Sequence, residues 1–314
     1  MTKQVLEFDI LILGGGPAGM SAGVYAARGA VKSAIIDISM FGGQPSNYLE
    51  IENYIGFPII GGYDLSEKFE EHADKFGVEK FPFQEIQSVD LVSNPKIIET
   101  TDKIFKTKSL IITTGATSKK LGIKGEVEFT GRGVSYCAVC DGAFYKDKEI
   151  AVIGGGNSAV EEGIYLTRFA KKVYIINRSN ELKADKILQN KANENNKITI
   201  ICNTSPIEIT GNDKVEGVIL KNSITNETNE LKIDGVFPFI GLTPNIDLIN
   251  GQLQQDANGF IITDKNMRTS VEGVFAAGDV RTSPLRQVIT AASDGAIAAV
   301  NAIKYVEHSV ETKV

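Results

Sequence analysis

Cys137 and Cys140 are the side chains of this 314-residue sequence that are best spaced for chemistry. Two cysteines separated by two residues form either half of a zinc site or a redox-active disulfide. A zinc site needs two further ligands, and the sequence offers only Cys202, His72 and His308, which are scattered along the chain. The redox interpretation is favoured, because neighbouring groups stabilise one thiolate of such a pair and let it attack disulfides at neutral pH.

Asp141 follows the cysteine pair directly. A carboxylate at this position is suited to take or give the proton during thiol–disulfide exchange. The same side chain is also suited to cap a helix, and the two roles are compatible. Cys202 follows the strand-like run Ile198–Ile201, and we expect it to be a small buried apolar residue.

A glycine-rich turn near the start of the chain predicts a dinucleotide site. Gly14, Gly16 and Gly19 come after an apolar run that predicts a buried strand, and a run of small residues typical of a helix follows. Asp37 ends the next predicted strand. In this arrangement the glycines permit a tight turn, the approach of a pyrophosphate and close helix–strand packing, while the carboxylate binds ribose hydroxyls.

A second turn of the same type, Gly154-x-Gly156-x-x-Ala159, lies between a predicted strand and a predicted helix. Its next strand ends at Asn177 without a carboxylate, which counts against NAD as the ligand. A 2′-phosphate requires cations, and only Arg178 and Lys183 lie within local reach. The alternative is a lobe that is retained for structure and has lost its nucleotide, because a fold alone does not establish a function.

The two turns predict an α/β protein with two Rossmann-like domains of the three-layer ββα type. We expect crossings between the domains near residues 117–125 and 240–245, so that the second domain is inserted into the first. The first domain then comprises residues 1–117 and 245–314, including a long alanine-rich helix from about Leu285 to Val306. The inserted domain comprises residues 118–244.

Composition limits the class of protein. A net charge of -6 argues against nucleic acid or an anionic membrane as the main partner. No apolar run approaches the roughly 20 residues of a membrane span, and the N-terminal residues lack the pattern of a signal peptide. Three cysteines, two of them in one pair, are typical of a cytoplasmic redox protein and not of a secreted disulfide framework.

These features together closely resemble the low-molecular-weight thioredoxin reductases of the pyridine-nucleotide disulfide oxidoreductase class. The resemblance covers essentially the whole chain, and the position of the cysteine pair in the second lobe is its most specific feature. The matching segments, in the order and spacing of that family, are Gly14–Gly19, Gly42-Gly43-Gln44, Glu52-Asn53, Thr114-Gly115-Ala116, Cys137–Gly142, Gly154–Ala159, Gly278-Asp279 and Arg286-Gln287-Val288.

The resemblance implies that FAD binds the first lobe, passes two electrons to the Cys137–Cys140 disulfide and so reduces thioredoxin, with Cys140 facing the flavin. It implies a homodimer as well. It places Asp37 at the adenosine ribose, Gln44 and Asn53 near the isoalloxazine, Asp279 on the ribityl-phosphate side and residues 286–288 at the pyrimidine edge. The full set of residues implied for FAD is Gly14, Gly16, Pro17, Ala18, Gly19, Asp37, Gly43, Gln44, Asn53, Thr114, Gly115, Gly278, Asp279, Arg286, Gln287 and Val288.

The electron donor is where the sequence departs from that family. The family binds the 2′-phosphate of NADPH through His-Arg-Arg and a further arginine four positions on, whereas this chain has Asn177, Arg178, Ser179 and Lys183. Lysine lacks the bidentate fork of arginine, so weaker binding of NADPH is expected. NADPH is the expected donor, held by Gly154, Gly156, Ala159, Arg178 and Lys183, and reduced ferredoxin is the alternative because one branch of the family uses it.

Two further alternatives belong to other classes. A flavin reductase of the ferredoxin–NADP type shares the two lobes but lacks a paired-cysteine motif, so Cys137 and Cys140 argue against it. A non-catalytic flavoprotein with a decayed donor site is the other. It would stay yellow under every reductant except dithionite.

Overall fold

The computed structural model describes residues 3–47, 51, 53–136 and 138–311. The chain divides into two compact units, one formed by residues 1–117 and 243–314 and the other by residues 118–242. Each unit has a parallel sheet with helices on one face and antiparallel strands elsewhere, so the predicted α/β class with two Rossmann-like domains is confirmed.

The first unit is built on a seven-stranded sheet in the order β3-β2-β1-β6-β5-β4, with β16 also pairing with β6. The parallel pairs are β3–β2, β2–β1, β1–β6 and β6–β16. The pairs β4–β5 and β5–β6 are antiparallel. The strands are β1 (Gln4–Leu13), β2 (Ser33–Ile36), β3 (Glu79–Phe81), β4 (Ile86–Asp90), β5 (Lys96–Thr100), β6 (Lys103–Ile112) and β16 (Val274–Ala276).

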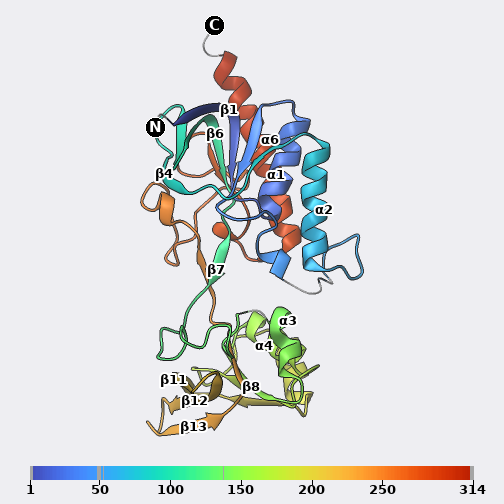
Figure 1. Ribbon diagram of the computed structural model, residues 1–314, viewed down its shortest axis with the longest axis vertical. Helices are drawn as coiled ribbons and strands as arrows, with labels where there is room; N and C mark the ends of the chain where they lie inside the picture. Colours follow the sequence, from blue (N-terminus) through green and yellow to red (C-terminus); the bar gives the residue numbers. More distant parts are fainter. Residues whose placement is uncertain (1–2, 48–50, 52, 137, 312–314) are drawn as a thin grey trace. The chain divides into compact units, whose positions relative to one another are not determined.

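Figure 1 shows three helices on one side of this sheet: α1 (Pro17–Arg28), α2 (Gly62–Lys75) and α6 (Val288–Glu311). Alternate residues of β1 face opposite sides, so Ile10 and Ile12 join the core beneath the helices while Leu11 and Leu13 join the core on the other face. Small residues let α1 and α6 approach closely. A Cβ on Gly295 would lie only 2.0 Å from the carbonyl oxygen of Ala18.

The second unit repeats this plan with a four-stranded parallel sheet in the order β10-β9-β8-β14. Ile150 and Val152 of β8 pack under the helices, while Ala151 and Ile153 pack against a three-stranded antiparallel sheet. The elements are α3 (Ala138–Asp141), β8 (Glu149–Ile153), α4 (Asn157–Leu166), β9 (Lys172–Ile176), α5 (Lys186–Glu194), β10 (Ile198–Ile201), β11 (Thr204–Gly211), β12 (Val215–Asn222), β13 (Thr228–Lys232) and β14 (Gly235–Pro238).

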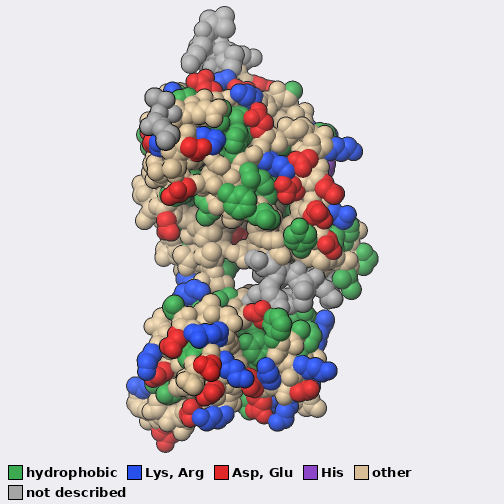
Figure 2. Space-filling model, viewed as in Figure 1, with side chains coloured by type: hydrophobic (Ala, Val, Ile, Leu, Met, Phe, Trp, Pro, Cys, Tyr) green, Lys and Arg blue, Asp and Glu red, His purple; other side chains and the backbone are tan. Residues whose placement is uncertain are grey.

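The two chain crossings between the units are β7 (Ala116–Ser118) and β15 (Leu242–Pro244), which pair with each other. Four short 3-10 turns complete the chain: η1 (Gln44–Asn47), η2 (Gly142–Tyr145), η3 (Asp247–Ile249) and η4 (Gly278–Val280). On the face of each unit seen in Figure 2, acidic and basic side chains are interspersed. Within the described ranges, no helix is long and apolar enough to cross a membrane.

Candidate active site

The first glycine turn joins β1 to α1, and at two of its positions a side chain would collide with the backbone. Gly14 has φ +113, and a Cβ there would lie 2.4 Å from the carbonyl oxygen of Thr113. A Cβ on Gly19 would lie 1.8 Å from the carbonyl oxygen of Gly14. Pro17 begins α1, where its missing N–H has no helical partner to lose. The free N–H groups at this helix start are suited to an anionic group such as a pyrophosphate.

Asp37, the residue after β2, lies against this turn as predicted from the sequence pattern. Its Oδ2 accepts a hydrogen bond from the backbone N–H of Gly15 at 2.6 Å, and its Oδ1 accepts one from the N–H of Ser39 at 2.8 Å. The carboxylate is therefore fixed at the rim of the turn, at the position where a dinucleotide fold binds ribose hydroxyls.

The Gly43–Gln44 segment meets the same turn, and further hydrogen bonds join the segments that follow β6. A Cβ on Gly43 would lie 2.9 Å from the Cα of Gly16, and the Nε2 of Gln44 donates to the carbonyl oxygen of Ala116 at 3.4 Å. Thr114 is held by Asn245: its Oγ1 donates to the carbonyl oxygen of Asn245 at 2.6 Å. The Asn245 amide in turn donates to the carbonyl oxygen of Thr114 at 2.8 Å.

The backbone N–H of Asn245 also donates to the carbonyl oxygen of Gly115 at 3.0 Å. Asn245 thus fixes the carboxyl end of β6 through three bonds. It was not among the residues that we predicted from the sequence, because nothing in its local pattern signals a partner 131 positions away.

The start of α6 brings in the remaining residues that the resemblance implied. A Cβ on Gly278 would lie 3.1 Å from the Cβ of Ala18, so η4 lies beside the start of α1. The Nδ2 of Asn53 donates to the Oε1 of Gln287 at 2.9 Å, which joins the loop before α2 to the turn before α6. Val288 packs against the small apolar cluster around Leu65.

Burial raises the pKa of the Asp279 carboxyl in η4, and the positive charge of Arg286 opposes this shift. The neighbouring Arg281 is more firmly paired. Its Nη1 lies 2.9 Å from the Oδ2 of Asp294, and both side chains are largely buried. Asp294 Oδ2 also accepts from the N–H of Gly278 at 3.2 Å, so this ion pair ties η4 to α6. The sequence pattern had not indicated this pair.

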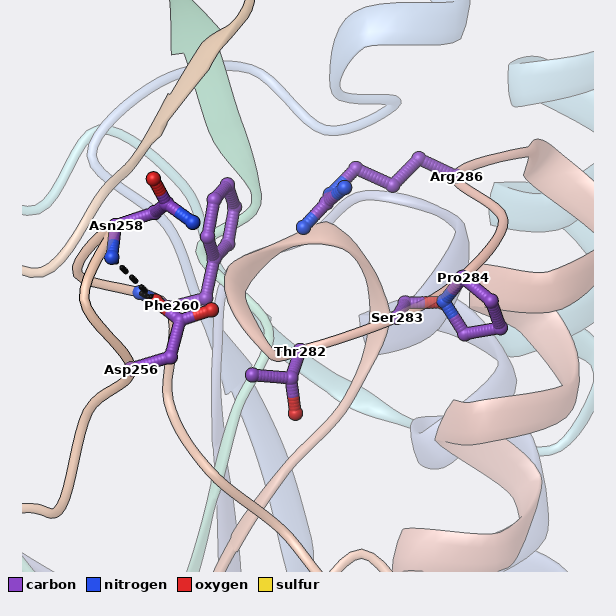
Figure 3. A pocket seen from close by; sticks show the side chains of 7 residues that line it. All are labelled: Asp256, Asn258, Phe260, Thr282, Ser283, Pro284 and Arg286. Atoms are coloured by element: carbon purple, nitrogen blue, oxygen red, sulfur yellow. Dashed lines mark hydrogen bonds between the residues drawn. The ribbon is translucent and has the colours of Figure 1, made fainter.

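Arg286 borders a hollow of about 520 Å³ together with Asp256, Asn258, Phe260, Thr282, Ser283 and Pro284. In Figure 3 the guanidinium of Arg286 and the ring of Phe260 point toward each other, and the guanidinium carbon lies 4.0 Å from the ring centroid. The Nε of Arg286 is buried and finds no hydrogen-bond partner among the described residues. A buried donor without a partner in the described ranges is suited to bind an acceptor atom of a ligand.

The cysteine pair lies in the second unit. Cys137 and also Glu52 are outside the described residues, while Cys140 belongs to the short helix α3, which ends at Asp141. Ala138 is almost fully buried in the core of the unit, so the start of α3 is anchored there. Burial, with the charges of Asp141 and Asp234 nearby, raises the pKa of Tyr145 to about 12.

A buried carboxylate fixes the residue before the pair. Glu126 is 1% exposed and accepts hydrogen bonds from the backbone N–H groups of Leu121 and Gly122, each at 2.7 Å. It also accepts from the hydroxyl of Tyr136 at 2.6 Å, and Lys120 lies over the ring of that tyrosine. The segment after β7 and the segment before the cysteines are thereby held by one side chain, which the sequence analysis had missed.

The second glycine turn joins β8 to α4. Gly154 has φ +144, and a Cβ there would lie 2.3 Å from the carbonyl oxygen of Phe239. Gly156, by contrast, has no atom within 4 Å of a built Cβ, so this position of the turn is open. Ala159 packs in the core beneath α4, whereas Arg178 and Lys183 are exposed. The described residues contain no group of three or more His, Cys, Asp or Glu placed to hold a metal ion.

Two glycine turns at helix starts, one beside an acidic strand end, together with a separate cysteine pair, define a nucleotide-linked disulfide oxidoreductase. The chain belongs to the pyridine nucleotide-disulphide oxidoreductase family, whose model matches residues 8–295. It is therefore an oxidoreductase of the class that acts on disulfides.

Relatives of known function narrow this class. The thioredoxin reductase of Bacillus subtilis is 46% identical over 306 residues, which cover 97% of this chain and 96% of that protein. A crystal structure of Lactococcus lactis thioredoxin reductase, in its FR conformation, is 45% identical with a TM-score of 0.88 and covers 96% of this chain and 99% of that one. The predicted resemblance to the low-molecular-weight thioredoxin reductases is confirmed.

A third relative has ferredoxin in its name. The ferredoxin-flavin thioredoxin reductase from Clostridium acetobutylicum is 30% identical, with a TM-score of 0.54, and covers 97% of this chain and 100% of that one. Both its sequence identity and its TM-score are lower than those of the Lactococcus lactis structure.

Proposed function

We propose that this chain is an FAD-dependent thioredoxin-disulfide reductase that takes its electrons from NADPH. The observation that carries the proposal is a cysteine pair within the second of two dinucleotide folds, in a chain 46% identical over nearly its whole length to a thioredoxin reductase. FAD supplies the two-electron transfer that links a nicotinamide to a disulfide.

The cysteines carry out the exchange with thioredoxin. One thiolate of the reduced pair attacks the thioredoxin disulfide and forms a mixed disulfide, and the second thiolate then displaces the bound thioredoxin. The cysteine pair of the enzyme ends as a disulfide and thioredoxin is released as a dithiol, so two electrons and two protons have passed from the enzyme to thioredoxin. Asp141, which ends α3, is the side chain that we assign to give and take the proton.

We assign FAD to the domain formed by residues 1–117 and 245–314. Two features support this fit: the glycine positions at which any side chain would collide with the turn, and the buried Nε of Arg286 without a partner in the described chain. Asp37 is held at the rim where the adenosine ribose belongs, while Asn53, Gln287 and Asp279 lie on the segments around the start of α6.

We assign the nicotinamide nucleotide and the redox disulfide to the inserted domain, residues 118–244. The open position at Gly156 and the free N–H groups at the start of α4 fit a pyrophosphate. Arg178 and Lys183 are the cations available for a 2′-phosphate. We also propose that the protein is a homodimer, on the basis of the family resemblance. We propose a cytoplasmic location on the basis of its cysteine usage.

One observation favours reduced ferredoxin as a second candidate donor. Asn177 occupies the first position of the family's 2′-phosphate motif, and its side chain is buried and bonded to its own loop. A protein that takes electrons from ferredoxin would keep this unit only as the carrier of the disulfide.

An anaerobic titration of the purified holoprotein tests the donor. We expect NADPH to bleach the absorbance of oxidised flavin stoichiometrically, and reduced ferredoxin not to be required. Bleaching by ferredoxin but not by NADPH would show that ferredoxin is the electron donor. Bleaching by dithionite alone would contradict the proposal that the protein is an enzyme.

A cysteine variant tests the reaction itself. We expect Cys140→Ser to abolish reduction of thioredoxin while the flavin is still bleached by the donor. Cys202→Ser is the matched control, because Cys202 lies outside the redox pair, and we expect it to keep full activity. Disulfide reduction that survives Cys140→Ser would contradict the proposal.

A further inference from the structure

The residue that follows β9 is turned into the protein and bonded to its own loop. Asn177 is 5% exposed, and its Nδ2 donates hydrogen bonds to the carbonyl oxygens of Ser179 at 3.0 Å and Glu181 at 2.8 Å. Its Oδ1 lies 2.4 Å from where a Cβ on Gly155 would be, so the amide packs directly on the glycine turn.

The rest of this loop, residues 177–185, is closed onto the turn as well. The backbone N–H groups of Lys183 and Ala184 donate to the carbonyl oxygen of Gly155 at 2.7 and 3.0 Å. At the start of α4, the side chain of Asn157 accepts from the N–H of Asp185 at 2.8 Å and donates to its Oδ2 at 2.9 Å. We call residues 177–185 the clasp loop.

The position of Asn177 is the one that separates the two nicotinamide nucleotides in a dinucleotide fold. A carboxylate there binds the ribose 2′-hydroxyl of NAD, and an arginine nearby accommodates the 2′-phosphate of NADP. Asp37 in the first unit has a carboxylate at the turn, whereas Asn177 has a neutral amide whose Nδ2 is bonded to its own loop. The second unit therefore has no carboxylate for the 2′-hydroxyl at this position.

Two exposed cations remain on the clasp loop for a 2′-phosphate. Within the part of the chain that the structure describes, neither Arg178 nor Lys183 takes part in an ion pair. The same loop carries the carboxylates of Glu181 and Asp185, which oppose an added phosphate. Charge pairs in exposed positions contribute little, so two of them correspond to a preference on the order of tenfold.

We propose that the second unit prefers NADPH to NADH only weakly, that Arg178 and Lys183 supply this preference, and that Asn177 is a positioning residue which holds the loop that carries them. The inference rests on the proposed function, in which a nicotinamide nucleotide is the donor. It makes NADH a second usable donor for this enzyme.

Binding of NADP⁺ and NAD⁺ to the oxidised holoenzyme, measured by isothermal titration calorimetry, tests the preference without turnover. We expect NADP⁺ to bind on the order of tenfold more tightly, with an advantage that declines as salt rises. In the double variant Arg178→Ala/Lys183→Ala the ratio should fall to about twofold, with the Kd for NAD⁺ unchanged. The matched control, Lys214→Ala/Lys221→Ala, removes two exposed charges of the same unit, and it should keep the wild-type ratio.

The role of Asn177 has its own readout. Asn177→Ala should lower the affinity for NADP⁺ by about the same factor as the double variant while leaving NAD⁺ within about twofold. When Asn177→Ala is combined with the double variant, the preference for NADP⁺ over NAD⁺ should not fall further, because both changes remove the same interaction with the 2′-phosphate. A general loosening of the unit would instead weaken both nucleotides together.

The possible failures are distinguishable. A preference for NADP⁺ above about a thousandfold, or a wild-type preference that persists in the double variant, would overturn this inference and leave the NADPH-dependent reductase intact. Saturable binding of neither nucleotide would reject the nicotinamide donor and this inference with it.

Discussion

Gly16 and Gly19 are both glycines of the first turn, but the structure requires them for different reasons. A side chain on Gly19 would collide with the protein, since its Cβ would lie 1.8 Å from the carbonyl oxygen of Gly14. A Cβ on Gly16 would meet only the Cα of Gly43 at 3.7 Å, and the φ of Gly16, -78, suits any residue. We therefore assign Gly16 to the approach of a ligand, whereas Gly19 allows the close packing of helix on strand.

This difference leads to opposite predictions for the two alanine variants. Gly19→Ala should lower the free energy of unfolding of the apoprotein by about 1–3 kcal/mol, because the turn must shift to relieve the clash. Gly16→Ala should leave that stability within about 0.5 kcal/mol but weaken FAD binding at least tenfold. Urea unfolding of the flavin-free protein and fluorescence titration with FAD measure the two effects. Equal loss of stability in both variants would contradict the assignment.

At the scale of elements, helix α4 carries a partly buried carboxyl group, that of Glu162. Burial, together with the charge of Glu161, raises the pKa of Glu162 from 4.5 to about 7. A carboxyl group with a raised pKa favours the folded state while it is protonated. The stabilising contribution of protonated Glu162 is complete below pH 4.5 and is lost as the pH rises through about 7.

We therefore expect Glu162→Gln to be more stable than the wild type at pH 8, by on the order of 3 kcal/mol, and to approach it near pH 4.5. Urea unfolding across this pH range, followed by circular dichroism, measures the difference. Glu161→Gln is the matched control, because it should lower the pKa of Glu162 and recover only part of the gain. A stability difference that does not change with pH would show that Glu162 does not titrate in this range.

Elements with strong local patterns were the ones that the sequence predicted. The strand predicted to end at Asn177 agrees with β9, and the helix predicted after the second glycine turn agrees with α4. The alanine-rich helix was predicted from about Leu285 but begins at Val288, because the turn before it is fixed by the Thr290 side chain. The sheet β11-β12-β13 was not predicted, since β13 is mostly exposed and shows no apolar alternation.

At the scale of the molecule, the second unit is one continuous stretch of chain with cores of its own. Its two hydrophobic clusters draw all their members from residues 118–242. The first unit is different, because its sheet and helix layer need β16 and α6 from the end of the chain.

A fragment of residues 118–242 should therefore fold by itself, with a single cooperative urea transition and without bound flavin. The matched fragment of residues 1–117 should remain largely unfolded, because it lacks the helix that packs on α1 and the strand that pairs with β6. Circular dichroism and the dispersion of amide resonances distinguish the outcomes. A disordered 118–242 fragment would mean that the two units depend on each other for stability.

We could predict from the sequence both glycine turns, the acidic strand end at Asp37, the cysteine pair and the order of the two lobes. All of these depend on residues close together in the chain, whose spacing fixes a strand, a turn and a helix start in turn. The arrangement of Gly14, Gly19 and Asp37 found in the structure follows from that spacing.

The tertiary structure alone decided how the polar side chains are used. Asn53 meets Gln287 across 234 positions of sequence, Asn245 closes the end of β6, and Asn177 turns inward to its own loop. In the first two cases the partners lie 234 and 131 positions apart in the sequence, and in the third the fold packs the Asn177 amide against the second glycine turn. Local spacing carries no record of such partners, because they exist only in the folded chain.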